Sequence, residues 1–361
     1  MLEAEPQLND NPRALVYHYP VLPHLERMGL LEDCVADGFT RQDFGWHVYS
    51  TGEMIHWTLS CLDGHVPHPY ALHLHQGQLS RVLARHLERQ SSVDIRFSTR
   101  LTGCTRYADR VVVEVEGPGG LETLEGDFLI GADGANSVIR REVLGLEFLG
   151  VTWPERYVAT NTRIDLARHG FPNCVMQLDK KHGAVICKID ASDYWRITFV
   201  EDPSLPIEEL PARIDAMFVD HVPERDYEVV AFAPYRMHQR IADNMRVGRV
   251  LLVGDAGHIT NPTGGLGLTG GMFDAFALIE ALNRVLHEGA ADDVLDFYGR
   301  DRRRVFAEIT SPRASENLRL LYHTKEGEQK EEWIAWLRDV GRSNDRMRAE
   351  FGFTEQLGSR F

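Results

Sequence analysis

The sequence predicts an α/β fold, in which a doubly wound parallel sheet is interrupted by an antiparallel β domain and followed by C-terminal helices. Two short apolar runs, residues 128–130 and 249–253, each lead into a glycine–aspartate turn, which is typical of parallel strands. The segment between them holds several β-forming runs separated by polar turns. From Gly271 to near Arg348 the apolar residues recur at helical spacing.

Length and composition exclude several classes of protein. The chain has 361 residues, 43% hydrophobic and 26% charged, which suffices for a sizeable core. A net charge of −15 without a dense basic stretch argues against binding to nucleic acid or to an anionic membrane. No apolar run reaches the roughly 20 residues of a membrane helix, and the acidic start is unlike a secretory signal. Five scattered cysteines without a CxxC pair favour reduced thiols in the cytoplasm, so we expect neither a disulfide framework nor a metal site.

Local patterns predict the remaining elements. Residues 12–33 favour a short helix that ends at Met28 and Gly29, because glycine often terminates helices. Apolar residues at helical spacing predict a second helix over 77–89. Strands are expected over 93–97, 111–116, 127–130, 157–164, 184–189 and 195–200, and an amphipathic helix over 206–219. The expected domains are a nucleotide-binding domain over 1–150 and 241–310, a substrate-binding antiparallel β domain over 151–240, and C-terminal helices over 311–361.

The first candidate site follows the apolar run at 128–130. The segment 131–137 reads GADGANS, and a helix is expected to begin at its end. Small residues let the backbone approach a phosphate, and N–H groups at a helix start favour anions. Arg140 and Arg141 would add charged donors. Taken alone, the Asp133-Gly134 pair is also what an ordinary strand-to-helix turn would contain.

The second candidate site follows the apolar run at 249–253 and reads GDAGHITNPTGGLGLTGG over 254–271. Asp255 lies at the carboxyl end of the predicted strand, where open α/β sheets bind ligands. Its carboxylate can accept hydrogen bonds from a sugar or polyol hydroxyl. The glycines after Pro262 leave room for a flat ligand and open a helix at about Gly271, whose positive end would face that ligand.

Residues 265–270 also match the dinucleotide fingerprint GxGxxG. A true fingerprint follows its strand directly, and an acidic residue ends the next strand about 20 residues later. Here ten residues, 255–264, intervene, and the acidic pair Asp292 and Asp293 lies between predicted helices. We therefore reject a pyrophosphate loop at this place, although a short NAD-only oxidoreductase that uses these glycines stays open as an alternative.

Together the two motifs resemble those of the class A flavoprotein monooxygenases, the para-hydroxybenzoate and phenol hydroxylase family. The family's DG motif is similar to residues 131–140, and its GD motif to 254–258 followed by 262–268. Asp133 and Asp255 are 122 residues apart with a β-rich insert between them, as the family's architecture implies. The resemblance extends from about residue 12 to residue 304.

The resemblance implies that the chain binds FAD. Asp255 would hold the ribityl chain, Pro262 would lie beside the flavin ring, and 264–268 would run under its pyrimidine edge. Asp133 and Gly134 would lie near FAD and the pyrophosphate of the nicotinamide cofactor. Segments around Arg13 and Gln76 are weaker matches, for which a plain helix start is the alternative. The residues expected to bind the cofactor are thus Arg13, Gln76, Asp133, Gly134, Asp255, Pro262, Gly264, Gly265, Leu266, Gly267 and Leu268.

The activity that the resemblance implies is hydroxylation of an aromatic ring. NADPH or NADH would reduce FAD, O2 would add at flavin C4a, and the hydroperoxide would transfer one oxygen atom to a phenolic or polycyclic substrate. No catalytic acid or base is predicted, because the candidates for substrate activation are equivalent in the sequence: Tyr157, Arg163, His182 and Tyr194. Trp333 and Trp336 suit core or dimer contacts, so a homodimer is possible.

The N-terminus departs from the family's pattern. The family begins with a strand, a GxGxxG turn and a helix, and a βαβ unit takes about 30 residues or more. No such unit precedes Asn11. We therefore expect either a truncated hydroxylase without the site for the ADP half of FAD, or a natural short form. The short form would be a flavin-free pseudoenzyme or a module that binds an aromatic ligand.

Overall fold

Parallel strand pairing brings the two glycine motifs together. The computed structural model describes residues 1–8, 14–180, 182–221, 226–323 and 327–359. Strand β9 (Leu129–Gly131) pairs in parallel with β16 (Val250–Leu252), and Gly131 is opposite Leu252. The turns that follow these strands therefore start side by side. Strand β15 (Arg246–Val247) pairs with the other edge of β16.

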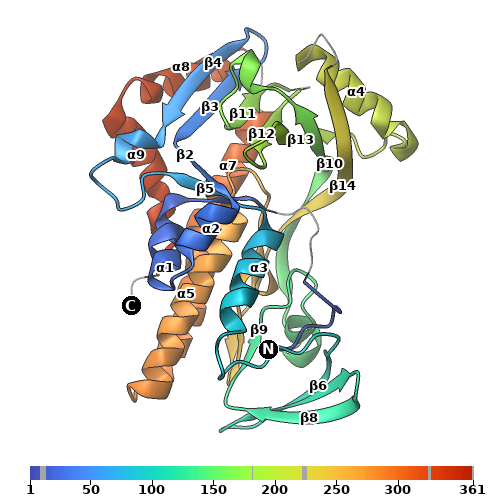
Figure 1. Cartoon of the computed structure of the whole chain (residues 1–361), viewed down its shortest axis with the longest axis vertical. Helices are drawn as coiled ribbons and strands as arrows, with labels where there is room; N and C mark the ends of the chain where they lie inside the picture. The colour runs from blue at the N-terminus through green and yellow to red at the C-terminus, as the bar shows by residue number, and fades with distance from the viewer. Residues whose placement is uncertain (9–13, 181, 222–225, 324–326, 360–361) are drawn as a thin grey trace.

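The largest sheet among the described residues has eight strands and forms the upper half of the molecule in Figure 1. Its neighbours pair antiparallel except β11 and β3, which are parallel. In spatial order the strands are β17 (His258–Ile259), β14 (Tyr227–Ala242), β10 (Phe148–Ile164), β13 (Tyr194–Glu201), β12 (Ala184–Lys188), β11 (Cys174–Leu178), β3 (Asp43–Val48) and β4 (Glu53–Thr58).

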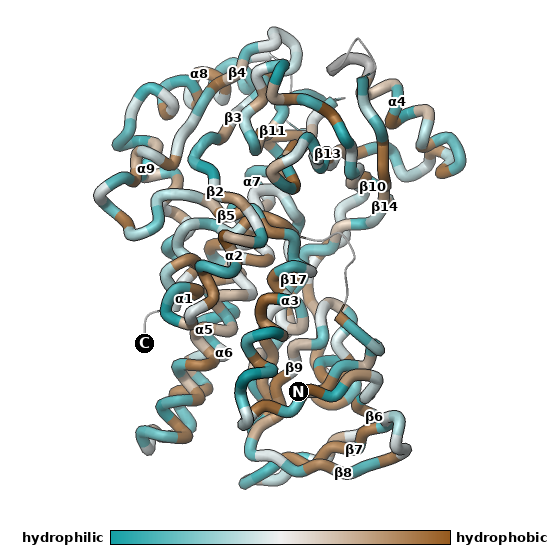
Figure 2. The backbone as a smooth tube through the Cα atoms, in the orientation of Figure 1, coloured by the Kyte–Doolittle hydropathy of each residue, from teal (hydrophilic) through white to brown (hydrophobic). Residues whose placement is uncertain are grey.

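Two further sheets among the described residues have three strands each and are antiparallel. One consists of β1 (Val16–Tyr17), β5 (Ala71–His73) and β2 (Phe39–Arg41). The other consists of β6 (Arg100–Arg106), β7 (Val111–Gly117) and β8 (Gly120–Gly126). Figure 2 shows the mostly hydrophobic colouring of β7, the central strand of that sheet.

The helices surround these sheets, with α5 running from the centre of the molecule toward its lower left end and α8 and α9 beside β3 and β4 (Figure 1). The helices are α1 (Leu22–Arg27), α2 (Leu31–Asp37), α3 (Gln76–Leu87), α4 (Leu210–His221), α5 (Leu266–His287), α6 (Asp293–Val305), α7 (Ser311–Tyr322), α8 (Glu328–Gly341) and α9 (Asn344–Gly352). Within the described ranges, no helix is both long enough and apolar enough to cross a bilayer.

The glycine motifs rest on a buried apolar layer. Strand β16 packs against Ala277 and Leu278 of α5 and against Leu295 of α6. The hydroxyl of Tyr298 donates to the carbonyl of Leu252 over 2.7 Å, which ties α6 to the end of β16. Removing apolar surface from water stabilises the folded chain by about 25 cal/mol per Å². This packing holds β16 in place, and the turn that follows β16 therefore begins at a fixed point.

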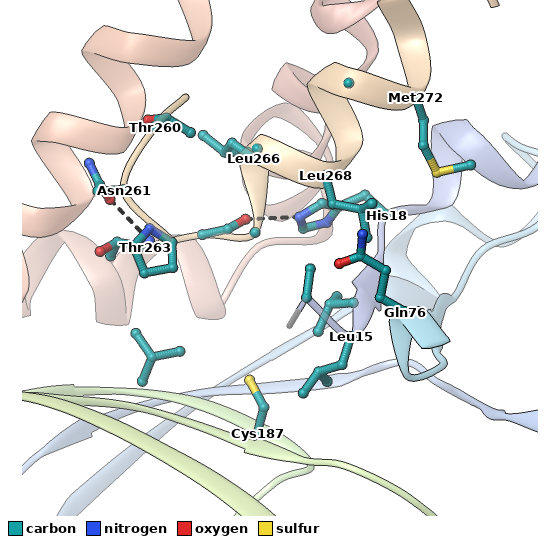
Figure 3. A pocket seen from close by; sticks show the side chains of 18 of the residues that line it. Leu15, His18, Gln76, Cys187, Thr260, Asn261, Thr263, Leu266, Leu268 and Met272 are labelled. Carbon is teal, nitrogen blue, oxygen red and sulfur yellow. Dashed lines mark hydrogen bonds between the residues drawn. The ribbon is translucent and has the colours of Figure 1, made fainter. Parts of the chain in front are cut away.

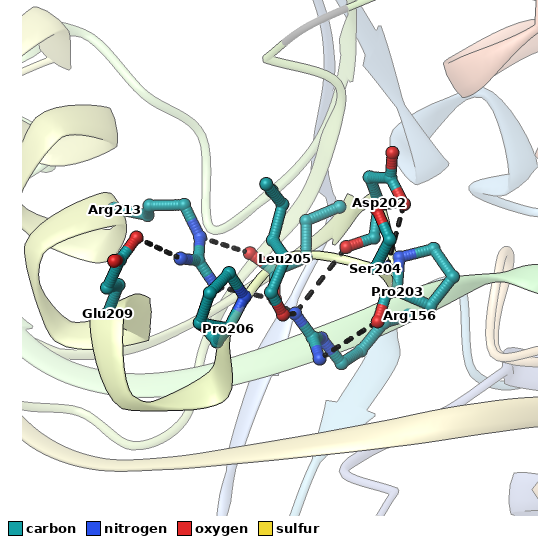
Figure 4. Close-up of polar contacts among 9 residues, drawn as sticks. Arg156, Asp202, Pro203, Ser204, Leu205, Pro206, Glu209 and Arg213 are labelled. Carbon is teal, nitrogen blue, oxygen red and sulfur yellow. Dashed lines mark hydrogen bonds and ion pairs between the residues drawn. The ribbon is translucent and has the colours of Figure 1, made fainter.

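A buried carboxylate, that of Glu201, holds helix α4 against one face of the large sheet. Glu201 at the end of β13 accepts from Arg156 of β10 at 2.6 Å and from Arg213 of α4 at 2.8 Å. The side chain of Glu201 is 7% exposed, so solvent screens these pairs less than surface pairs. Figure 4 shows the same arginines reaching the 202–206 loop, where Arg156 Nη2 donates to the carbonyl of Leu205.

The predicted fold class is confirmed: the chain is α/β, with a large sheet that holds parallel and antiparallel pairs and with C-terminal helices. The division into domains stays a prediction. The structure adds that β3 and β4 belong to the same sheet as the strands between residues 151 and 240.

Three local predictions were wrong. The helix predicted within 12–33 is not continuous over the described residues 14–33, because Val16 and Tyr17 pair with β5 as a strand and two helices follow. The predicted end at Met28 and Gly29 is confirmed. Residues 93–97 do not form a strand and contain an isolated bridge from Arg96 to Leu2. The helix expected from Gly271 begins at Leu266, since Gly265 adopts the left-handed conformation that starts it.

Candidate active site

A cavity of about 1710 Å³ lies between the two glycine turns and the large sheet. Single small-molecule pockets usually measure about 300–1,000 Å³, so this one has room for a cofactor and a substrate together. Arg13 lies outside the described residues. All the other residues expected to bind the cofactor line the cavity, namely Gln76, Asp133, Gly134, Asp255, Pro262, Gly264, Gly265, Leu266, Gly267 and Leu268. That they bind FAD stays a prediction.

The turn after β16 is shaped by two glycines. Gly254 has φ +59°, a backbone conformation that other residues rarely adopt. A Cβ on Gly271 would lie 3.3 Å from the Cα of Gly254, so the first part of α5 packs directly on the turn. This close approach leaves Asp255 as an exposed carboxylate on the cavity wall.

A buried ion-pair network lies beneath this turn. The carboxylate of Asp274 accepts from the backbone N–H of Gly254 at 3.0 Å, contacts His258 Nε2 at 2.8 Å and accepts from Arg302 Nε at 2.6 Å. Burial raises the pKa of Asp274, but His258 and Arg302 outweigh that effect, so its pKa falls below the ordinary value. Arg302 also donates to the carbonyl of Leu357. The ionised carboxylate therefore fixes the position of the residue before Asp255.

The start of α5 gives the cavity a positive end. Gly264 and Gly265 have φ +96° and +68°, and Gly265 is the residue that caps the helix. Because glycine has no side chain to accept from the first turn, the backbone N–H groups of 266–268 have no capping acceptor from that residue. Together with the helix dipole they favour negative charge in the cavity. These features fit the electron-rich edge of a flavin ring.

His18 was not singled out in the sequence, yet it contacts this loop. Its Nε2 lies 2.9 Å from the carbonyl oxygen of Gly264, as Figure 3 shows. Burial lowers the pKa of His18 to about 4, and the charge of Arg41 acts in the same direction although the contact with Gly264 opposes it. The ring is therefore neutral near pH 7, and Nε2 carries the proton, because a carbonyl oxygen only accepts.

The turn after β9 is held by its own aspartate. Asp133 accepts from the hydroxyl of Ser137 at 2.5 Å and from the backbone N–H of Ile139 at 3.1 Å. Arg140, which the sequence suggested as a donor to an anion, is buried and donates to the backbone carbonyls of Ala135 and Ala256. Arg140 therefore joins the two turns.

The large sheet supplies the opposite wall. Trp195, Ile197 and Phe199 of β13 pack into the apolar layer with α4, so the alternate residues Arg196 and Thr198 face the cavity. Arg196 Nε donates to Asn161 Oδ1 at 3.0 Å. The rest of this wall is mainly aromatic and includes Phe44, Trp46, Trp57 and Tyr235 of the sheet, beside Tyr322 at the end of α7.

The residues considered for substrate activation lie elsewhere. Arg163 packs over the ring of Tyr194, with its guanidinium 5.2 Å from the ring centre, and His182 stacks on Tyr49. Tyr157 is buried against Tyr322. Among the described residues that line the cavity, none of those four appears. The alternation of apolar residues along β13 was the signal that could have identified Arg196 instead.

Comparisons with known proteins agree with this geometry. A family model described as "FAD binding domain" matches residues 1–313. The chain belongs to the class A flavoprotein monooxygenases. It is 57% identical over 360 residues to 6-hydroxy-3-succinoylpyridine 3-monooxygenase HspB of Pseudomonas putida (strain DSM 28022 / S16), covering 99% of this chain and 91% of that protein. It is 40% identical to para-nitrophenol 4-monooxygenase of Pseudomonas sp. (strain WBC-3), covering 88% and 79%.

Solved structures give the same result. The crystal structure of p-nitrophenol 4-monooxygenase PnpA from Pseudomonas putida DLL-E4 matches with a TM-score of 0.93 and 36% identity over 100% of this chain and 92% of that one. A ternary complex of aklavinone-11 hydroxylase with FAD and aklavinone matches with a TM-score of 0.77 and 26% identity over 89% and 64%. The predicted family and enzyme class, an FAD-dependent monooxygenase, are confirmed, and the flavin-free module is not favoured.

Proposed function

We propose that this chain uses FAD, O2 and NADPH or NADH to hydroxylate a monocyclic aromatic or heteroaromatic compound that already carries a hydroxyl group. One observation carries the proposal: the same cavity is lined by both glycine turns and by the aromatic and polar side chains of the large sheet. A cofactor held by the turns would therefore share one cavity with a substrate held by the sheet.

The chain's own residues have defined tasks in this proposal. Asp255 would accept hydrogen bonds from the ribityl chain, and the backbone N–H groups at the start of α5 would stabilise negative charge on the reduced ring. When bound, FAD supplies the redox chemistry, taking a hydride from the nicotinamide and passing one oxygen atom of O2 to the substrate ring. The positioning residues and the exclusion of water are the protein's contribution.

The chemistry of the substrate follows from the sheet wall and from the relatives' names. Both named substrates are six-membered rings with a hydroxyl group para to a second substituent, either a succinoyl or a nitro group. In this chain Arg196 supports binding of an anionic or electron-rich substituent. Burial raises the pKa of Tyr235 to about 12, although Arg196 opposes it, so its hydroxyl stays protonated and can donate to the substrate. Aromatic neighbours suit the ring itself.

Flavin binding and substrate-dependent oxidation test the proposal. The full chain is loaded with FAD, and oxidation of NADPH and of NADH is followed with para-nitrophenol, with 6-hydroxy-3-succinoylpyridine and without substrate. We expect substrate to accelerate oxidation and the product to carry one new oxygen atom. Asp255→Ala should lose FAD, whereas Asp345→Ala, whose side chain is 92% exposed on α9, should keep it. Full FAD occupancy in the Asp255 variant, or oxidation that no ring compound accelerates, would contradict the proposal.

A further inference from the structure

Two cysteines face each other on the cavity wall. Cys174 of β11 and Cys187 of β12 are opposite each other in the antiparallel register, and their sulfur atoms lie 3.1 Å apart. Both are free thiols, and both line the cavity. Figure 3 shows Cys187 with its sulfur directed from the strands toward the space below the loop at Thr260 to Thr263.

The backbone already has the geometry of a cross-strand disulfide. The backbone N–H of Lys188 donates to the carbonyl of Asn173 at 2.8 Å, so that pair is hydrogen-bonded. The next pair, Cys174 and Cys187, is therefore of the non-hydrogen-bonded kind, whose Cα atoms are about 4.5 Å apart. Disulfides need Cα atoms about 4.4–6.8 Å apart. A bond between the two sulfurs requires no movement of the strands.

The surroundings separate these thiols from the other cysteines. A hydrogen bond from Cys187, followed by the charge of Arg41, outweighs burial and lowers the pKa of Cys174 to about 7, while the pKa of Cys187 rises. Burial raises the pKa of Cys34, Cys61 and Cys104. Because the thiolate is the nucleophile, we assign the first attack on an oxidant to Cys174 and the second to the sulfur that faces it, Cys187.

We propose that Cys174 and Cys187 form an oxidation site, which hydrogen peroxide converts into a reversible disulfide on the cavity wall. The thiolate of Cys174 attacks one peroxide oxygen, which gives a sulfenic acid and releases hydroxide. The sulfur of Cys187 then attacks the sulfenic sulfur; the S–S bond forms, and the oxygen leaves as water. In total, two thiols lose two electrons and two protons, and one peroxide becomes two waters. The site does not depend on the proposed hydroxylase activity, since no flavin takes part.

Thiol counting and peptide mapping test this proposal on the full chain. After peroxide treatment, the number of free thiols should fall from five to three, and the intact mass should fall by two hydrogen atoms. Digestion without reductant should yield one peptide pair, joined through Cys174 and Cys187, and dithiothreitol should restore all thiols. Cys104→Ser, which replaces a cysteine away from the cavity lining, should form the same link.

Single variants separate the two roles. In Cys187→Ser the oxidation should stop at a sulfenic acid on Cys174, which a 1,3-dicarbonyl reagent traps. In Cys174→Ser no disulfide should form, because the cysteine opposite Cys187 on the facing strand is gone. If either variant fails to fold, judged by its thermal unfolding curve, the alanine variant replaces it. A link that involves another cysteine, over-oxidation of Cys174 without any link, or five unchanged thiols would overturn the proposal.

Discussion

Arg140 and Ala256 connect the two glycine turns: Nη1 of the arginine donates to the alanine carbonyl over 2.8 Å, although the residues are 116 positions apart. The arginine side chain is 2% exposed, and its guanidinium lies 3.7 Å from the centre of the Phe148 ring. Its second nitrogen donates to the carbonyl of Ala135. The spacing of the turns therefore depends on a residue that is not among the described lining of the cavity.

Replacing Arg140 should damage both stability and FAD binding. Arg140→Gln removes bonds to two backbone carbonyls, and leaving buried acceptors unsatisfied costs about 1–3 kcal/mol. We expect a lower free energy of unfolding in urea and a weaker FAD affinity in a fluorescence titration. Arg141→Gln is the matched control, because Arg141 is 53% exposed and pairs with its neighbour Glu142. Equal effects in the two variants would contradict the role given to Arg140.

Gly264→Ala should lower the free energy of unfolding by more than the unfavourable backbone conformation alone explains. The residue has φ +96°, and a Cβ there would lie 2.6 Å from Asn317 Nδ2, so the Asn317 side chain must turn away and lose its hydrogen bond to the carbonyl of Thr263. Gly289 also has a positive φ, +71°, but a Cβ there would have no neighbour within 4 Å, so Gly289→Ala measures the conformational cost, about 1–2 kcal/mol. We expect a larger loss of unfolding free energy for Gly264→Ala, and weaker FAD binding in that variant only. Identical losses would show that the cavity loop tolerates the side chain.

His18 should make stability depend on pH in mildly acidic solution. Its pKa is about 4 in the folded chain and 6.5 in the reference state, so the unfolded chain binds more protons between these values. Stability then rises with pH across this window, by at most about 1.4 kcal/mol per pH unit for one group. His18→Gln keeps a donor for Gly264 but cannot titrate, so the slope of unfolding free energy against pH should fall. An unchanged slope in His18→Gln would contradict this role of His18.

Arg196 should govern affinity for an anionic ring compound, provided that the proposed function holds. Removing a charged hydrogen-bond donor costs about 1.5–3 kcal/mol, which corresponds to an increase in KM of about 10- to 160-fold. Arg196→Gln should show this increase in steady-state kinetics, with a smaller change in FAD affinity. Arg163→Gln is the control, since that arginine lies on the same sheet but packs over Tyr194 outside the cavity lining. A KM that is unchanged in Arg196→Gln would exclude a direct contact.

Elements with a local signal were predictable from the sequence. Helix α3 follows the spacing of its apolar residues, and β7 follows its run of valines. The glycine turns were found because their conformations need glycine itself, as at Gly254. Residues 93–97 show why such signals fail: the segment suits a strand but finds no long partner, and only Arg96 forms a bridge.

The contacts within the cavity depend on tertiary pairing, which no single segment encodes. His18 contacts Gly264, which is 246 positions away in the sequence. Cys174 and Cys187 lie opposite each other only because of the register in which their two strands pair. The start of α5 at Leu266 was missed because Gly267 and Gly270 have low helix propensity. Close packing against the turn at Gly254 outweighs that propensity.

The parallel pairing of β9 with β16 also has a consequence for how the chain reaches its native state. Gly131 and Leu252 can meet only after the polypeptide between them has been gathered, and closing so long a loop is slow and entropically costly. We therefore expect the ligand crevice to form late in folding. Added flavin should consequently leave the early refolding phases unchanged and retard unfolding of the finished molecule.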